Sequence, residues 1–176
     1  MEMRRTLVIV RHAKAEAFAP EDHARVLSAR GEADAYRLGA ELALRGVEPT
    51  AAVVSDAART RGTWAQIRAG AEENGATWSP VVDFSRAVYS SDPETLLQLV
   101  REVDAEAPAL MVVGHNPTVA TLALLLDDGD GDPAAARAMA GGYPTAAYAV
   151  FSVPGEWRDL DFGGARLDVF GVARAG

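Results

Sequence analysis

Two histidines and two arginines of this chain occur where phosphoryl chemistry needs them. Arg11 and His12 directly follow a short apolar run, His115 follows another within Gly-His-Asn-Pro, and Arg59 comes five residues after a third. A neutral imidazole can attack phosphorus and carry the group covalently, while guanidinium groups hold phosphoryl oxygens. We therefore predict phosphoryl transfer with His12 as nucleophile, Arg11 and Arg59 as oxygen ligands, and His115 stabilising the developing charge.

The apolar runs before these residues predict the strands of a mainly parallel sheet. Runs that are apolar without alternation are typical of strands buried on both faces. Amphipathic stretches lie between them, so we expect an α/β fold with three α/β/α layers. We predict strands at 6–10, 51–54, 80–84, 110–113 and 145–153, an edge or antiparallel strand near 167–172, and helices at 28–45, 55–71, 94–103 and 117–126.

Turn and cap residues give the expected ends of these helices. Ser55 and Asp56 offer N-cap chemistry for the second helix, and Asp92 does so for the third, where Pro93 suits the first turn. Gly46 is a plausible stop for the first helix. The acidic, glycine-rich segment 127–133 is expected to be a surface loop after the fourth helix.

The positions of the polar residues suggest that they converge. In open α/β sheets, ligands bind beyond the carboxyl ends of the strands, and the two histidines and two arginines follow three such ends. Taken alone, these polar residues have simpler structural explanations. His115 could cap the next helix, and Arg61 is interpreted as part of a solvated helix face. The combination at three strand ends favours a catalytic site.

Composition narrows the class of protein. The chain has 176 residues, no cysteine, a formal net charge of −8 and only one lysine, Lys14. This length fits one domain over 1–176. The acidic balance argues against partners such as nucleic acid or anionic membranes. No export signal or membrane-length apolar run is visible, so we expect a cytoplasmic protein.

Several segments resemble the histidine phosphatase superfamily, also called phosphoglycerate mutase-like. Residues 7–16 resemble the strand and Arg-His-Ala of its SixA-type branch, the protein phosphohistidine phosphatases. Residues 22–31, 55–63 and 113–117 resemble that branch's Asp-x-x-Arg-x-Leu-Thr-x-Arg-Gly, Ser-x-x-x-Arg-x-x-x-Thr and Val-Gly-His-Asn-Pro, and residues 143–146 fit a late family strand. The resemblance implies His12 as phosphoacceptor, with Arg11, Arg59 and His115 completing the pocket. The expected substrate-binding residues are Arg25, Ser55, Gly114, Asn116 and Thr145.

Some features set this chain apart from the family. Position 56 is Asp where Pro is common, position 58 is Ala where a larger apolar residue is usual, and His23 is interpreted as incidental. Larger family members carry a Glu that protonates an alkoxide leaving group, and no clear counterpart occurs between 83 and 92. General-acid help is worth about 100- to 10,000-fold, so its absence favours cleavage of a P–N bond. The remaining candidate acids are Asp22, Asp83, Asp92 and Glu94.

Three functions stay open at this point. The preferred one is hydrolysis of protein phosphohistidine; the others are hydrolysis of a small phosphorylated metabolite and non-catalytic binding of phosphate or phosphoprotein. A mutase is disfavoured because the chain lacks room for long insertions. We expect no cofactor and no metal: the Asp-rich segment 128–132 imitates a calcium loop, but Pro133 replaces its glycine and Met139 its bidentate Glu.

Overall fold

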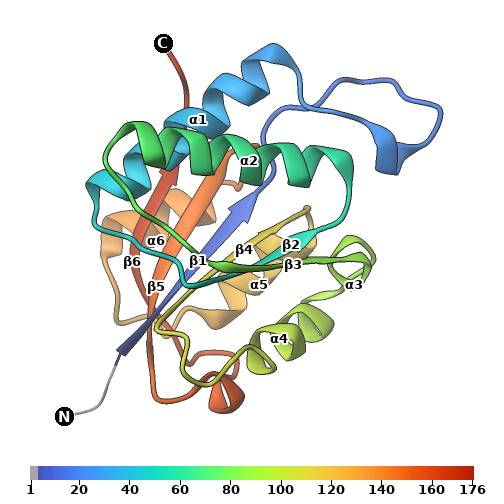
Figure 1. Ribbon diagram of the computed structural model, residues 1–176. Helices are drawn as coiled ribbons and strands as arrows, with labels where there is room; N and C mark the ends of the chain where they lie inside the picture. Colours follow the sequence, from blue (N-terminus) through green and yellow to red (C-terminus); the bar gives the residue numbers. More distant parts are fainter. Residues whose placement is uncertain (1–3) are drawn as a thin grey trace.

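A computed structural model describes residues 4–176 and shows one mixed sheet between two layers of helices (Figure 1). The sheet has the strand order β3-β2-β4-β1-β5-β6, and β5 is antiparallel to both of its neighbours. The strands are β1 (Arg4–Arg11), β2 (Ala51–Ser55), β3 (Val81–Ser85), β4 (Ala109–Gly114), β5 (Ala147–Pro154) and β6 (Arg166–Val172). The predicted three-layer, mainly parallel architecture is confirmed, and β6 is the antiparallel edge strand expected near 167–172.

The two faces of the sheet carry separate cores. Alternate residues of β1 point in opposite directions: Leu7 and Ile9 pack with α4, α5 and α6, whereas Val8 and Val10 pack with α1 and α2. The helices are α1 (Ala29–Leu44), α2 (Ala58–Glu73), the short α3 (Arg86–Tyr89), α4 (Pro93–Arg101), α5 (Thr118–Leu126) and α6 (Pro133–Ala140). Within the described residues, none of them has both the length and the apolarity to cross a bilayer.

Two glycines let α1 and α2 approach each other closely. A Cβ atom added at Gly39 of α1 would lie 1.9 Å from the backbone oxygen of Ile67 in α2. A Cβ atom added at Gly70 of α2 would lie 1.9 Å from the backbone oxygen of Tyr36 in α1. Any side chain at either position would push the helices apart, so this contact fixes the position of α2 and of Arg59 near its start.

The structure corrects the predicted start of α2. Its N-cap is Ala57, which has no side-chain cap bond, and not Ser55 or Asp56. The predicted cap at Asp92 is confirmed, since its carboxylate accepts the backbone N–H of Thr95 at 2.7 Å. Ser55 is the last residue of β2 instead, and its hydroxyl is used within the site.

Two helices were not predicted. The alanine-rich segment after the acidic loop forms α6, which begins with Asp132 as N-cap and Pro133 in its first turn. The Asp-Pro pair is a regular helix start, but it was interpreted only as the end of the loop. The one-turn α3 follows β3 directly, and it carries Tyr89.

Candidate active site

The predicted site residues meet at the carboxyl ends of β1, β4 and β2. Arg11 ends β1 and pairs in register with Gly114, which ends β4. The backbone N–H of His12 donates to the Gly114 oxygen at 3.1 Å, which extends the pairing by one residue. The chain then leaves the sheet as a loop that carries the 3₁₀ helix η1 (Asp22–Ala24), drawn in blue beyond this edge in Figure 1. The structure therefore brings the segments together as the strand-end rule predicts.

His12 is held as a neutral imidazole with a defined tautomer. Its Nδ1 lies 2.7 Å from the backbone oxygen of Ala13 and donates to it, which leaves the lone pair on Nε2. Burial lowers the pKa of His12 to about 4, with smaller contributions from nearby arginines and partial opposition from the Ala13 bond. The Ala13 N–H in turn donates to Thr63 Oγ1 at 3.0 Å. An uncharged Nε2 is the form needed for nucleophilic attack.

His115 lies beside His12, with ring centroids 5.3 Å apart. Its Nε2 is 2.7 Å from the hydroxyl of Ser55, while its Nδ1 is buried and has no hydrogen-bond partner within residues 4–176. Burial, and then the charges of His12 and Arg59, lower the pKa of His115 to about 3. We assign the Ser55 hydroxyl as the donor to Nε2, which places the ring proton on Nδ1 and makes that buried, unpaired atom a donor. His115 does not cap α5, whose N-cap is Pro117.

Arg11 and Arg59 also present buried donors without partners. The Nε atoms of both guanidinium groups are buried and unpaired within the described residues. Arg11 Nη1 donates to the backbone oxygen of Tyr143 at 3.1 Å. Arg5 Nε and Trp78 Nε1 are buried and unpaired elsewhere in the described residues, so the informative feature is that three such atoms belong to Arg11, Arg59 and His115, where they can serve an anionic acceptor.

Asp22 pairs with Arg59 in a way that sequence reasoning did not foresee. Arg59 Nη1 donates to the backbone oxygen of Asp22 at 2.9 Å, and Nη2 donates to its carboxylate at 3.0 Å. The hydroxyl of Tyr89 donates to the same carboxylate oxygen at 2.6 Å. This Tyr89 bond, followed by those from Arg59 and Arg25, holds the pKa of Asp22 well below its usual range. Asp22 is therefore ionised and unsuited to protonating a leaving group near neutral pH.

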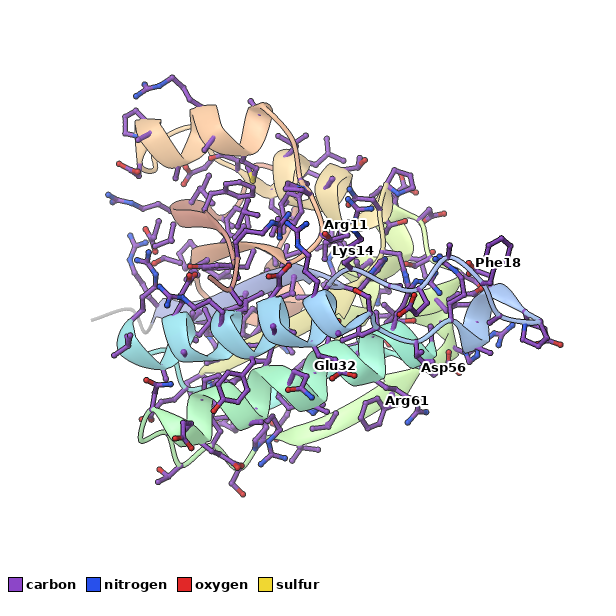
Figure 2. The ribbon with its side chains drawn as sticks, turned by 90° about the horizontal axis from the view of Figure 1, so that it is seen from above. Arg11, Lys14, Phe18, Glu32, Asp56 and Arg61 are labelled. Atoms are coloured by element: carbon purple, nitrogen blue, oxygen red, sulfur yellow. The ribbon has the colours of Figure 1, made fainter. Side chains whose placement is uncertain are left out.

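Tyr89 is a residue of the site that no motif pointed to. Its ring meets the edge of His115 at 5.4 Å between centroids and that of His23 at 4.9 Å. His23, interpreted from sequence as incidental, has Nε2 only 2.7 Å from Asp56 Oδ1. That pair ties the η1 loop to the residue that stands where the family commonly has Pro, so His23 has a structural contact that the sequence did not predict. Asp56 and Arg61 lie together near the start of α2 in Figure 2.

The remaining predicted substrate-binding residues have partners within the protein. Arg25 Nε donates to the Asp22 carboxylate at 3.0 Å, the salt bridge considered as its alternative role. Asn116 Nδ2 donates to the backbone oxygen of Tyr143 at 2.8 Å. The backbone oxygen of Thr145 accepts a hydrogen bond from Arg174 Nη1. A Cβ atom added at Gly114 would lie 2.9 Å from Val119 Cγ1. Gly114 is thus required for packing against α5, apart from any contact with substrate.

The other candidate acids and Arg61 have roles outside the pocket. Asp92 caps α4, and Glu94 lies exposed in the first turn of that helix. Asp83 is exposed on β3, where it lines a cavity with Glu102. Arg61 is exposed with its guanidinium 4.3 Å from the Phe84 ring centroid, as expected of a helix-surface residue. Among the four candidate acids, only Asp22 contacts a site arginine.

Comparisons with known proteins agree with this site. No family model matches the chain. An uncharacterised protein of Mycobacterium tuberculosis is 32% identical over 167 residues, which span 94% of this chain and all of that protein. The structure of a candidate phosphohistidine phosphatase SixA from Nakamurella multipartitia is 32% identical, covers 97% of this chain and 96% of its own, and superposes with a TM-score of 0.80. A second such structure, from Agrobacterium tumefaciens, is 27% identical, covers 95% and 97%, and has a TM-score of 0.74.

These similarities extend over nearly the whole chain. The chain belongs to the histidine phosphatase superfamily, and within it to the SixA-type branch. Its class is therefore that of the phosphatases.

Proposed function

We propose that this protein hydrolyses protein phosphohistidine through a phosphoryl group carried on His12. The observation that carries the proposal is the set of three buried, unpaired donors beside a neutral imidazole: Nε of Arg11, Nε of Arg59 and Nδ1 of His115. A phosphoryl group has three equatorial oxygens that can accept from such donors.

The reaction has two steps. His12 Nε2 attacks phosphorus as the P–N bond to the substrate imidazole breaks, and that ring leaves as a neutral group because its other nitrogen was already protonated. Nδ1 of His12 keeps its proton and its bond to the Ala13 oxygen, which disperses the positive charge on the phosphorylated ring. Water then attacks phosphorus, phosphate departs and His12 returns to its neutral form. Arg11, Arg59 and His115 hold the oxygens throughout.

The state of the carboxylates supports a P–N substrate over an alkyl phosphate. An alkoxide leaving group needs a general acid, commonly worth about 100- to 10,000-fold. Asp22 contacts Arg59 but is ionised, because Tyr89, Arg59 and Arg25 all hydrogen-bond to its charged form. An imidazole leaving group needs no such acid.

The experiment compares substrates and then traps the intermediate. We expect faster turnover of a phosphohistidine-bearing protein than of phosphoserine peptides or sugar phosphates. Brief incubation with a phosphoryl donor is expected to give an acid-labile label that His12→Asn abolishes and the control variant His23→Asn retains. Faster hydrolysis of alkyl phosphates would refute the substrate assignment, and a label that survives in His12→Asn would refute the nucleophile.

A further inference from the structure

A groove runs from the active site toward the edge of the sheet. We call it the α6–β6 groove; it has a volume of about 690 Å³, and its lining includes Arg11, Asn116, Arg137, Tyr143, Phe170 and Val172. The groove is shallow and wide open to solvent, as suits an extended polypeptide better than an enclosed small ligand. It lies between the C-terminal end of α6 and the last residues of β6.

The groove borders the predicted phosphate site at Arg11, which belongs to both. Arg11 Nη1 and Asn116 Nδ2 both donate to the backbone oxygen of Tyr143, so these residues form a wall common to the pocket and the groove. Since β6 and β1 are both antiparallel to β5, β6 ends at the same edge of the sheet as β1. A substrate whose phosphoryl group lies at His12 can therefore extend along this edge toward Val172.

The charge of the groove is opposite to that of the whole molecule. Its described lining includes two arginines and no carboxylate, although the chain has a net charge of −8. Arg137 is exposed on α6, and neither it nor Arg11 takes part in an ion pair within residues 4–176. By contrast, the cavity beside α4, of about 480 Å³, is lined by four acidic residues and no basic one.

Apolar groups form the rest of the groove. The Phe170 ring meets the Tyr143 ring edge-on with 5.2 Å between centroids, and Val172 is 37% exposed. Because β6 is the edge strand, no further strand covers this side of the sheet. Apolar surface beside the exposed Arg137 guanidinium, which has no ion-pair partner within residues 4–176, suits a chain that carries both apolar and acidic side chains.

We propose that the α6–β6 groove binds the polypeptide that flanks the substrate phosphohistidine and selects acidic residues there through Arg137. The inference rests on the proposed function and adds to it a class of protein substrate, one with carboxylates beside the phosphorylated residue.

The test uses two phosphohistidine peptides of equal length, one flanked by Glu and the other by Lys. We expect the wild-type protein to favour the Glu peptide in kcat/KM by roughly two- to fivefold, as exposed charge pairs commonly do, and less so at high salt. Arg137→Glu is expected to reverse the preference. The matched control Arg158→Glu, on the exposed 3₁₀ helix η2 (Trp157–Asp159), is expected to keep it.

A second variant tests the groove apart from its charge. Ala138 is exposed on α6 and lines the groove, so Ala138→Trp narrows it without disturbing a core. We expect the kcat/KM ratio of either peptide to phosphoramidate, a small P–N compound, to fall about tenfold, on the order of a lost apolar contact. An unchanged ratio would contradict binding in the groove.

The outcomes separate this inference from the proposed function. Equal turnover of the two peptides by the wild-type protein, or a Glu preference that survives in Arg137→Glu, overturns the groove assignment while phosphohistidine hydrolysis stands. If neither phosphohistidine peptide is hydrolysed but phosphoserine peptides are, the proposed function has failed. The same Glu and Lys comparison on phosphoserine peptides then decides whether the groove selects acidic flanks.

Discussion

Lowering the pH tests the central claim about His12 directly. Its pKa is lowered to about 4, mainly because the ring is 8% exposed and lies near arginines. At pH 5.5 a group with that pKa is about 3% protonated, whereas an ordinary histidine with a pKa of about 6.5 would be about 90% protonated. The free protein is therefore expected to keep a neutral nucleophile under conditions in which most histidines are charged.

Nitrogen-15 NMR of the imidazole rings can measure this difference. The chain has three histidines, so its spectrum has three sets of ring signals, and that of His12 is identified by its loss in His12→Asn. We expect the His12 signals at pH 5.5 to be those of a neutral ring protonated at Nδ1, because Nδ1 donates to Ala13. Titration should begin only near pH 5.

Two results would refute the reasoning. A His12 titration midpoint at or above pH 6 would show that burial does not control the charge of the ring. A neutral ring protonated at Nε2 would place the lone pair toward Ala13 and remove the nucleophile from the site. The measurement needs no substrate, so a failure to find the right substrate cannot obscure it.

Four further outcomes are expected. Because the pKa of His12 is lower in the folded protein than in the unfolded chain, the free energy of unfolding should fall as the pH drops from 6.5 toward 4. From pH 7 to pH 5, the free energy of unfolding measured by urea titration should fall by about 2 kcal/mol more for the wild-type protein than for His12→Asn. Asp22→Asn removes a negative charge that competes with the phosphoryl group for Arg59. Tungstate, an oxyanion that stands in for phosphate, should therefore inhibit at about fivefold lower concentration, because roughly 1 kcal/mol of repulsion between Asp22 and the oxyanion is lost. Unchanged inhibition would contradict competition between Asp22 and the oxyanion for Arg59. Ser55→Ala removes the partner of His115 Nε2, and kcat should fall about tenfold with little change in Tm. Gly39→Ala inserts a Cβ atom 1.9 Å from the Ile67 oxygen, and thermal unfolding should show a loss of about 1 to 3 kcal/mol, whereas an unchanged Tm would contradict the close helix contact.

The sequence predicts much of the fold because its strands are locally encoded. The runs before His12 and His115 are apolar without interruption, which is typical of strands in a covered parallel sheet. The strand-end rule then places Arg11, His12, Arg59 and His115 at one edge without any knowledge of loops. The same rule says nothing about which groups hold these side chains in place.

The missed contacts all join residues that are distant in sequence. Tyr89 reaches Asp22 across 67 positions, and His23 reaches Asp56 across 33. Neither pair has a local pattern, because a lone Tyr or His in a loop is compatible with many environments. The start of α2 was misplaced for a related reason: Ser55 has the chemistry of an N-cap, but its hydroxyl is next to His115. Tertiary contacts decided between two locally acceptable roles.

The ion pair between Asp22 and Arg59 makes phosphate affinity and loop position thermodynamically linked. Asp22 belongs to the loop that follows β1, and Phe18 in the same loop is 91% exposed at the far side from the sheet (Figure 2). Phosphate and Asp22 compete for Arg59, so a partner that binds the loop with Asp22 held away from Arg59 strengthens phosphate binding. By reciprocity, phosphate strengthens the binding of that partner by the same factor. A protein that binds Phe18 and shifts this loop would thereby change the affinity of the active site for phosphate without contacting that site.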